Sequence, residues 1–523
     1  MDTFTKKVFL VENHKTFVYN TDMYMTRKNI EIITQISLKD LLNELKTYTH
    51  QGDLELVKLA YDFAEDAHKG QTRKSGIPYI LHPLSAAHLL AQMRLDINII
   101  IAALLHDVPE DTAVTLEEVE KNFGKDVAEM VRGVTKLGHL KYRGVERYIE
   151  NLRKMFVAMA KDIRVMLIKF ADRINNLSTL DALPPKKRYR IALESLEIYS
   201  PIANRLGIGE IKHLLEDLSF KYIYPKEYER VKKVRDDYLT GNEEFLRDTM
   251  QKLKKELDSS DMRCLDIHGR EKTLYSLYKK ILRKGWDNIH KIHDIVAIRI
   301  IMSNIGDCYA SLGSIHKLWK PLKGRIKDYI AQPKPNGYKS IHTTVFCDKG
   351  KIVEFQVRDK IMHEEAEYGI AAHWHYDENG ATIPNRDLHW AKELAEIQKN
   401  VLNKLSDLNE LKLDFFKNRI FVFTPKGDVI DLPEDATPVD FAYHIHTDVG
   451  NRCNGARIND QIVSLDSQLN SGDVVEIIVD KNRKGPSPDW LKTVKTHMAK
   501  GRIRAKLKEQ KGHWLIQKFI HKK

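Results

Sequence analysis

The stretch Ile99-Ile-Ile-Ala-Ala-Leu-Leu-His106-Asp107-Val-Pro109-Glu110-Asp111 places an apolar run directly before one imidazole and three carboxylates. The run predicts a buried helix that carries His106 at its end, because uninterrupted aliphatic residues leave no face for solvent. Pro109 interrupts helical hydrogen bonding, so we expect the chain to turn where the carboxylates arrive. Burying such a group is costly unless a cation neutralises it, and a divalent metal ion is the obvious candidate.

Two other segments supply residues of the same chemical kind. His82 precedes Pro83, which suits the first turn of a helix, and Asp172 lies in the apolar stretch 166–173. Taken alone, His106-Asp107 is more simply interpreted as a core histidine paired with a neighbouring aspartate. Together, however, these residues form a nitrogen and oxygen ligand set from three predicted helices. With open positions, such a site activates a water, so the set predicts hydrolysis.

Periodicity along the chain predicts a multidomain α+β protein. Helical spacing dominates from about 41 to 225, which predicts an all-α domain after a lead-in at 1–40. The charged segment 226–263 is typical of a solvated helical connector. From 264 to 400 the pattern predicts an α+β domain with a mixed sheet. Its expected elements are a central strand at 292–302 that carries Asp294, a hairpin at 340–347 and 351–358, and helices at about 306–319, 363–373 and 387–407.

The last third of the chain predicts a smaller unit. A linker at 401–416 leads to a domain at 417–480, in which two strands flank 425–428 and a third strand lies at 473–479. Thr437 and Pro438 are placed as the cap and first residue of a helix. Residues 481–523 begin a helical region with 14 Lys and Arg against Asp489 and Glu509. This balance of +12 equals the net charge of the whole chain, so the rest is neutral. The basic segment suits contact with RNA phosphates, with a solvated helical linker as the equal alternative.

Composition fits a soluble protein of several domains. The chain has 523 residues, of which 42% are hydrophobic and 30% are charged. No apolar run is long enough to span a membrane, and the first residues lack the apolar core of a signal peptide. The four cysteines are scattered without a Cys-x-x-Cys pair, which is typical of a reducing compartment. We therefore expect a cytoplasmic location without membrane contact.

A second group of charged residues predicts a phosphate-binding site. Within 321–339, Lys323, Arg325, Lys327, Lys334 and Lys339 accompany the single acid Asp328. Such a loop suits a polyphosphate, whose charge the cations hold during phosphoryl transfer, although a solvated basic loop is the alternative. Two strand carboxylates, Asp294 and Glu354, suit Mg²⁺, which bridges phosphates. Further cations at Arg270 and Lys272, and the flat ring of Tyr338, favour a nucleotide.

His82, His106-Asp107 and Asp172 together resemble the HD superfamily of metal-dependent phosphohydrolases. The strings His68-Lys-Gly-Gln-Thr-Arg-Lys-Ser-Gly-Ile-Pro-Tyr and Lys169-Phe-Ala-Asp-Arg-Ile-Asn-Asn-Leu are similar to its RelA/SpoT branch, which makes and degrades the alarmone (p)ppGpp. The resemblance implies that the four residues bind Mn²⁺ and that Glu110 and Asp111 position or deprotonate the attacking water. It also implies that the alarmone pocket is lined by Arg73, Lys74, Asn176 and Thr179.

Asn336-Gly-Tyr-Lys-Ser-Ile-His-Thr-Thr344 resembles the signature of the RelA/SpoT synthetase domain, which has a nucleotidyltransferase-like fold. The resemblance implies transfer of the β,γ-pyrophosphoryl group of ATP to the 3′-hydroxyl of GDP or GTP. Tyr338 would stack on guanine, and Asp294 and Glu354 would serve as Mg²⁺ ligands and base. The implied phosphate contacts are Arg270, Lys272, Arg325, Lys327, Lys334 and His342. The form Arg325-Ile-Lys327-Asp328 is the one found in bifunctional members.

Residues 417–480 resemble the β-grasp TGS module. Together the resemblances cover about 40–523. They predict a bifunctional (p)ppGpp synthetase and 3′-pyrophosphohydrolase of the stringent response. The TGS module and the basic segment suggest contact with tRNA or the ribosome. Two alternatives are a hydrolase with a residual synthetase and an RNA-binding regulator with relic active sites. Long family members continue through zinc-binding and ACT-type modules, so we expect either a truncated form or a short natural variant.

Overall fold

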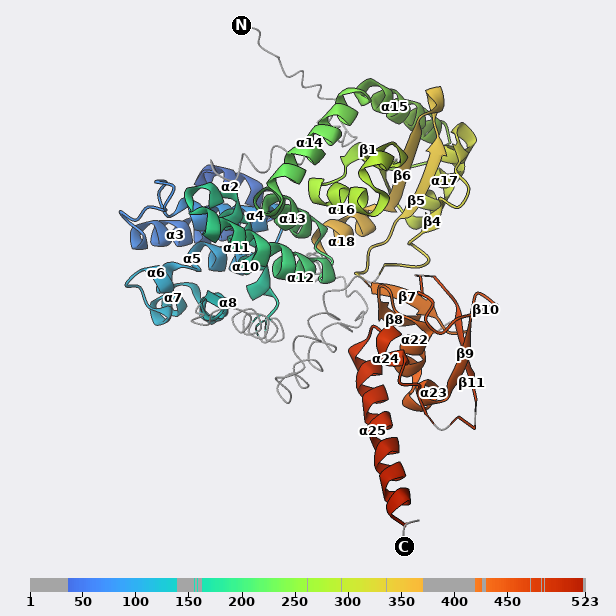
Figure 1. Cartoon of the computed structure of the whole chain (residues 1–523). Coiled ribbons are helices and arrows are strands. Elements are labelled where there is room, and N and C mark those ends of the chain that lie inside the picture. The colour runs from blue at the N-terminus through green and yellow to red at the C-terminus, as the bar shows by residue number, and fades with distance from the viewer. Residues whose placement is uncertain are drawn as a thin grey trace. The chain divides into compact units, whose positions relative to one another are not determined.

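The computed structural model describes residues 36–138, 162–369 and 419–520, together with Met155 and Ala158. Short gaps lie within these ranges at 261, 293, 335, 426–428, 471, 481 and 484. The expected lead-in up to residue 35, the helix at 387–407 and the linker at 401–416 fall outside the described residues. The confirmed fold class is mixed α+β, with a helical domain, a domain built on a mixed sheet, and a small C-terminal domain (Figure 1).

The elements of the N-terminal domain are helices, as predicted, apart from an isolated β-bridge between Thr72 and Pro78. Helix α5 (Ile97–Leu105) is its centre, and the side chains from Ile99 to Leu105 are all buried. Helices α3, α4, α8 and α10 pack against α5 on different sides, so an apolar residue is favourable at every position of the run. The helices are α2 (Leu38–Leu45), α3 (Gln51–Ala67), α4 (Leu81–Gln92), α6 (Val108–Asp111), α7 (Leu116–Phe123), α8 (Lys125–Gly138), α10 (Arg164–Ser178), α11 (Pro185–Glu194), α12 (Ser200–Arg205) and α13 (Gly209–Ile223).

The middle domain is built on a mixed sheet with the order β1-β2-β6-β5-β3, in which β4 also pairs with β5. Strands β2 and β6 are parallel and the other pairs are antiparallel. The strands are β1 (Cys264–Glu271), β2 (Val296–Met302), β3 (Lys320–Pro321), β4 (Lys327–Asp328), β5 (Ile341–Phe346) and β6 (Ile352–Asp359). Helices α16 (Leu274–Lys284), α17 (Ile305–Leu318) and α18 (Lys360–Tyr368) accompany them. The predicted hairpin is the β5–β6 pair, joined at Asp348–Gly350.

Two sequence expectations about this domain are wrong. Residues 226–263 are helical, as α14 (Pro225–Thr240) and α15 (Glu243–Ser259), but they are not a solvated connector. Leu246, Leu253 and Leu257 of α15 are buried in the same core as the sheet, because their spacing places them on one helix face. The described charged residues of the segment are exposed or half-buried, except Arg235, which is buried beside Glu271. Asp294 does not lie on the central strand, since β2 begins two residues later.

In the C-terminal domain, α22 (Pro438–Ile445) packs against strands and also against neighbouring helices (Figure 1). Thr437 caps this helix through a reciprocal box with Asp440, and Pro438 occupies its first turn, as predicted. The strands are β7 (Arg419–Phe423), β8 (Val429–Pro433), β9 (Cys453–Ile458), β10 (Gln461–Val463) and β11 (Val475–Val479). The helices α23 (Thr447–Asn451), α24 (Trp490–Thr493) and α25 (His497–Ile520) complete it.

The start of the basic segment is part of this domain rather than a solvated linker. Trp490, Val494, Ala499 and Ile503 are buried in one cluster with residues of α22. The basic side chains therefore lie on a helix that is anchored by its apolar face. Among the described residues, no helix is both long enough and apolar enough to cross a membrane.

Candidate functional site

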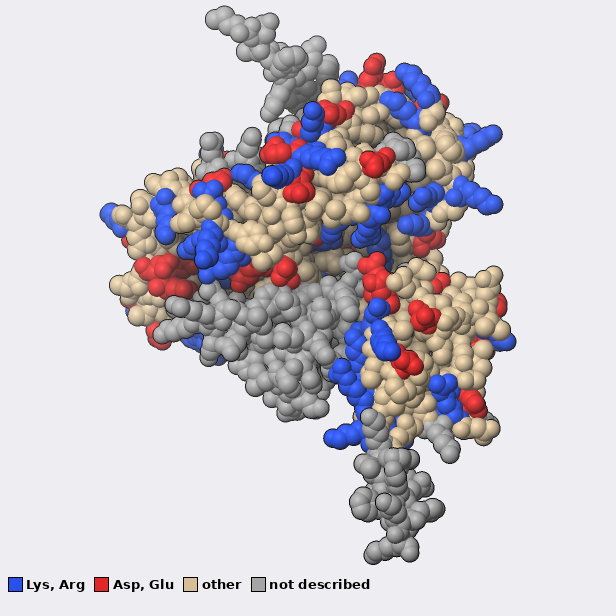
Figure 2. All heavy atoms as spheres, viewed as in Figure 1, with Lys and Arg blue, Asp and Glu red and all other residues tan. Residues whose placement is uncertain are grey.

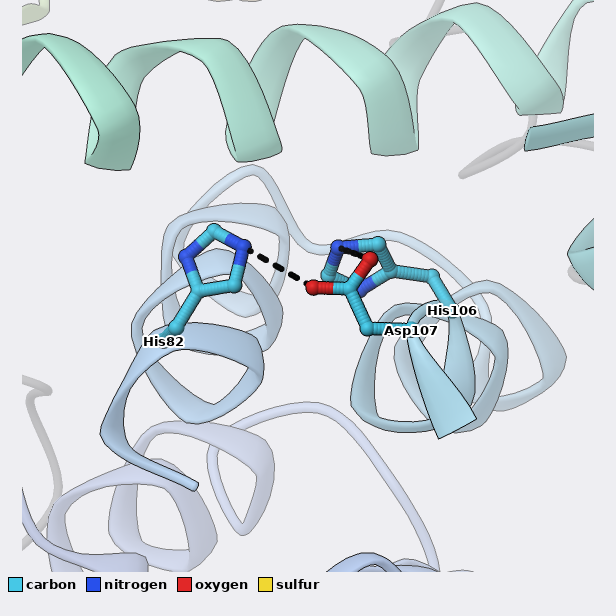
Figure 3. A group of neighbouring side chains, drawn as sticks. All are labelled: His82, His106 and Asp107. Atoms are coloured by element: carbon cyan, nitrogen blue, oxygen red, sulfur yellow. Dashed lines mark ion pairs between the residues drawn. The ribbon is translucent and has the colours of Figure 1, made fainter. Parts of the chain in front are cut away.

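The corner between α5 and α6 brings an imidazole and a carboxylate together. His106 is the C-cap of α5, and Pro109 lies in the first turn of the next short helix, α6, instead of continuing α5. The Nε2 atom of His106 lies 3.2 Å from Oδ1 of Asp107. Nε2 of His82, which comes from the first turn of α4, lies 3.3 Å from Oδ2 of the same carboxylate (Figure 3). The ligand atoms of these residues all lie within 4.8 Å of one another.

The outer hydrogen bonds of both imidazoles favour a metal between them. Nδ1 of His106 lies 2.8 Å from the carbonyl oxygen of Ala103 and donates to it, which leaves Nε2 with a lone pair. That Nε2 is buried and has no hydrogen-bond partner among the described residues. Nδ1 of His82 lies 2.6 Å from Oδ1 of Asn175, so its Nε2 also faces the carboxylates. The donor set fits a divalent ion that accepts imidazole and carboxylate ligands.

Asp172 of α10 completes the predicted set from a third helix. Its Oδ1 lies 3.3 Å from Nε2 of His82, while Lys169 donates to Oδ2 at 2.6 Å and Asn176 donates to Oδ1 at 2.5 Å. Burial opposes the ionised form, but Lys169 and His82 outweigh it and hold the pKa of Asp172 well below its ordinary value. Burial also opposes the charged form of His82, yet Asp107 and Asp172 raise its pKa to about 9.

Some of the other predicted hydrolase residues form hydrogen bonds within the site, and the rest lie beside it. Arg73 reaches into the site, where it donates to Oδ1 of Asn175 at 2.8 Å and to Oδ1 of Asn176 at 2.6 Å. Thr179 follows the end of α10, and Lys74 is exposed beside Arg73. Glu110 and Asp111 are exposed on α6, one turn from the metal-ligand candidates.

Sequence reasoning gave no role to three residues that hold this site. They are Lys169, Asn175 and Tyr79. The spacing of Lys169 and Asp172 is the one available signal, because residues three apart on a helix are neighbours.

In the middle domain, Asp294 is held by two lysines. Its Oδ2 lies 2.9 Å from Nζ of Lys272 and 2.5 Å from Nζ of Lys280, a residue that the sequence did not single out. Burial opposes ionisation, but these two cations outweigh it and lower the pKa of Asp294 to about 2. The other oxygen, Oδ1, is buried and has no hydrogen-bond partner among the described residues. A free carboxylate oxygen of this kind fits an Mg²⁺ ligand.

Glu354 lies on β6, where the strand register brings other predicted residues near it. Its Oε1 lies 3.4 Å from Nδ1 of His342 and accepts a hydrogen bond from Gln356 at 2.8 Å. Burial raises the pKa of Glu354, but His342 and Gln356 outweigh that effect and lower it to about 2, with Asp294 acting in the opposite sense. Arg270 on β1 donates to Oε1 of Gln356 at 3.4 Å. Both carboxylates are therefore held in the ionised form, with Lys272 and Lys280 beside Asp294 and with His342 and Gln356 beside Glu354.

The remaining predicted phosphate contacts lie on the short strand β4 and on turns. Lys327 on β4 pairs with His342 on β5, and Arg325 is exposed in the turn before β4. Residues Lys334 to Tyr338 form a turn of their own. The backbone N–H of Lys334 donates to the carbonyl oxygen of Tyr338, and the N–H of Gly337 donates to the carbonyl oxygen of Lys334. Within it, Nζ of Lys334 lies 4.6 Å from the centroid of the Tyr338 ring. Gly337 has φ +78°, a conformation that permits this tight turn.

Three family models match the chain in the order of its domains. The HD domain model matches residues 60–209, the model described as a region found in RelA / SpoT proteins matches 269–381, and the TGS domain model matches 420–479. The first two ranges contain the two groups of residues described above.

Curated relatives match nearly the whole chain. A guanosine-3′,5′-bis(diphosphate) 3′-pyrophosphohydrolase of Aquifex aeolicus is 46% identical over 91% of this chain and 68% of its own length. A GTP pyrophosphokinase of Myxococcus xanthus is 46% identical over 90% of this chain and 62% of its own length. The bifunctional (p)ppGpp synthase/hydrolase SpoT of Escherichia coli is 45% identical over 91% and 68%. The chain thus spans about two thirds of the length of these proteins.

Proposed function

The chain belongs to the RelA/SpoT family, and from this premise we propose that it both makes and degrades (p)ppGpp. The observation that carries the proposal is the presence of two separate charged sites on one chain. His82, His106 and Asp107 form a group suited to a metal, and Asp294 and Glu354 form a pair of ionised carboxylates among cations. The relatives carry names for a hydrolase, a pyrophosphokinase and a bifunctional enzyme, which agrees with two sites of different chemistry.

In the hydrolase site, His82, His106, Asp107 and Asp172 would hold a divalent ion, which we propose to be Mn²⁺. When bound, the ion supplies Lewis acidity toward a phosphoryl oxygen and toward water. Glu110 and Asp111 position or deprotonate the attacking water, so that one of the two carboxylates takes its proton as the water oxygen bonds to phosphorus. The bond between phosphorus and the 3′-oxygen breaks, and that oxygen leaves with the proton that the carboxylate had taken. Arg73 and Lys74 hold the phosphates, and Asn176 and Thr179 line the pocket for the rest of the alarmone.

In the synthetase site, Glu354 and Asp294 would act as the base for the acceptor nucleotide and as ligands of the ion, which we propose to be Mg²⁺. The 3′-hydroxyl of GDP or GTP attacks the β-phosphorus of ATP, its proton passes to a carboxylate, and AMP leaves. The basic groups hold the negative charge that spreads over the phosphoryl oxygens. These groups are Arg270, Lys272, Arg325, Lys327, Lys334 and His342. Tyr338 stacks on the guanine.

Both enzyme families imply dependence on divalent metals, while the identities Mn²⁺ and Mg²⁺ are parts of the proposal. We further propose a cytoplasmic location and contact of the C-terminal domain with tRNA or the ribosome. Lys500, Arg504 and Lys508 support the RNA contact, because a spacing of four residues places them on one face of α25. Lys and Arg side chains gather along the first turns of this helix (Figure 2).

Paired assays on single-site variants test the two activities together. Synthesis is measured with ATP, GDP or GTP and Mg²⁺, and hydrolysis with ppGpp and Mn²⁺. We expect Asp107→Ala to lower hydrolysis by more than about 100-fold, since even outer partners of a metal cost up to that much, and to leave synthesis intact. Asp294→Ala should have the opposite effect. Asp62→Ala, an exposed change on α3, is the matched control and should alter neither activity.

Each possible result bears on one part of the proposal. A wild-type protein that forms no (p)ppGpp would contradict the synthetase assignment, and one that does not release the 3′-pyrophosphate would contradict the hydrolase assignment. Loss of both activities in Asp107→Ala would mean that the residues do not belong to separate sites.

A further inference from the structure

Tyr79 lies between a metal-ligand candidate and a water-activating candidate of the proposed hydrolase site. Its hydroxyl oxygen lies 2.9 Å from Oδ2 of Asp107 and 2.5 Å from Oδ2 of Asp111. The same Oδ2 of Asp107 faces Nε2 of His82. One hydroxyl therefore connects the carboxylate of Asp107, which caps the N-terminus of the short helix α6, with that of Asp111, the last residue of this helix.

The surroundings of Tyr79 fix the position of that hydroxyl. The ring stacks on the imidazole of His68, with the centroids 4.5 Å apart, and His68 is almost fully buried. The backbone N–H of Tyr79 donates to the carbonyl oxygen of Gln71 at 3.1 Å. The side chain of Gln71 in turn donates to the carbonyl oxygen of Asp111 at 2.9 Å. The ring and the backbone of Asp111 are thus held by the same segment, which leaves the hydroxyl little freedom to move.

The chemistry of a phenol limits what this hydroxyl does. It has a single proton, so it donates to one of the two carboxylates at a time or shares the proton between them. A phenol ordinarily has a pKa of about 10, so the group keeps its proton near neutral pH. It is therefore a donor that orients carboxylates and takes no proton from the water.

We propose that Tyr79 is a positioning residue of the hydrolase site, which orients the carboxylate of Asp111 relative to that of Asp107. This inference rests on the proposed hydrolase function. By occupying Oδ2 of Asp111, the hydroxyl leaves Oδ1 to accept the proton of the water. By donating to Asp107, it fixes the rotation of a carboxylate that also faces both histidines. Outer hydrogen bonds of this kind orient metal ligands, and losing one typically costs about 10- to 100-fold in metal affinity or activity.

Tyr79→Phe in the full chain tests the proposal, because the ring and its stacking on His68 are kept. Calorimetric titration of the metal-free protein with Mn²⁺ measures binding, and the kinetics of ppGpp hydrolysis give kcat and KM. We expect Mn²⁺ binding to weaken by about 10-fold and kcat to fall by about 10- to 100-fold. The KM for ppGpp should change by less than about twofold, since uniform substrate binding is untouched. Tyr61→Phe is the matched control, because Tyr61 donates to Glu65 on the surface of α3 at 2.9 Å.

A double-mutant cycle with Asp111→Asn separates positioning from general loss of stability. If Tyr79 acts through Asp111, the loss caused by Y79F should shrink in the D111N background, while equal losses in both backgrounds would overturn the proposal. Wild-type Mn²⁺ affinity and kcat in Y79F would also overturn it. A wild-type protein without hydrolase activity would instead count against the proposed function. Synthesis of (p)ppGpp by each variant confirms that the chain is folded.

Discussion

Replacing Asp440 by asparagine would remove a buried negative charge at the point where α25 joins the C-terminal domain. The carboxylate is fully buried and accepts hydrogen bonds from two parts of the chain. From its own helix cap, the backbone N–H and the hydroxyl of Thr437 donate to Oδ2, each at 2.9 Å. From more than fifty residues away, the N–H of Lys495 donates at 3.0 Å, and the N–H and hydroxyl of Thr496 donate at 2.8 Å.

The expected loss follows from the number and kind of these bonds. A hydrogen bond to a charged group contributes about 1.5–3 kcal/mol, and leaving a buried donor without a partner costs about 1–3 kcal/mol. Asparagine keeps one acceptor oxygen but turns an NH₂ group toward N–H donors at the other position. We therefore expect D440N to destabilise the docking of the segment at 490–503 by about 3 kcal/mol, at the upper end of these ranges because several donors are affected.

Limited proteolysis measures this docking directly. Trypsin cleavage after Lys492 and Lys495 requires the segment to open, so a 3 kcal/mol loss predicts cleavage faster by about 100-fold when opening is in rapid equilibrium. Asp448→Asn is the matched control, because Asp448 is also in the first turn of a helix of this domain but its side chain is 70% exposed. Equal cleavage rates in D440N and D448N would refute the reasoning.

Three further results are expected. Burial lowers the pKa of His88 against the opposing effect of Asp40, so near and below the ordinary pKa of 6.5 the unfolded chain binds more protons than the folded chain. As the pH falls through this range, the free energy of unfolding of the helical domain should decrease by up to about 1.4 kcal/mol per pH unit, and by less in His88→Asn. Thermal melting between about pH 7.5 and 5.5 measures this decrease. Removing metal with a chelator should lower the melting temperature of the wild type but leave that of His106→Ala unchanged. The wild type should lose about 2.7 kcal/mol of unfolding free energy relative to the protein with metal at 100 times its Kd. Gly450→Ala places a methyl group against the Tyr443 ring and should destabilise the C-terminal domain by about 1–3 kcal/mol in a denaturant titration, while Gly501→Ala, which meets no atom within 4 Å, should be neutral or slightly stabilising.

The helical domain and the corner of its site follow from local sequence. An apolar run that ends at His106 before Pro109 dictates both a buried helix and a turn, since each rests on neighbouring residues alone. The helix start at Thr437 and Pro438 was predictable for the same reason. By contrast, the mistaken expectation for the segment at 226–263 came from its average charge. Its three buried leucines were visible only as a spacing, and spacing alone does not reveal that a sheet covers that face.

The chain by itself determined which groups are available: two histidines and two aspartates for one site, and two carboxylates with many cations for another. Only the tertiary structure decided how they are held. Asn175 orients His82 across 93 positions, Lys280 joins Lys272 at Asp294, and Tyr79 connects Asp107 with Asp111. The physical reason is that hydrogen bonds act over about 3 Å, and the fold brings distant residues within that range while separation along the sequence contains no information about it.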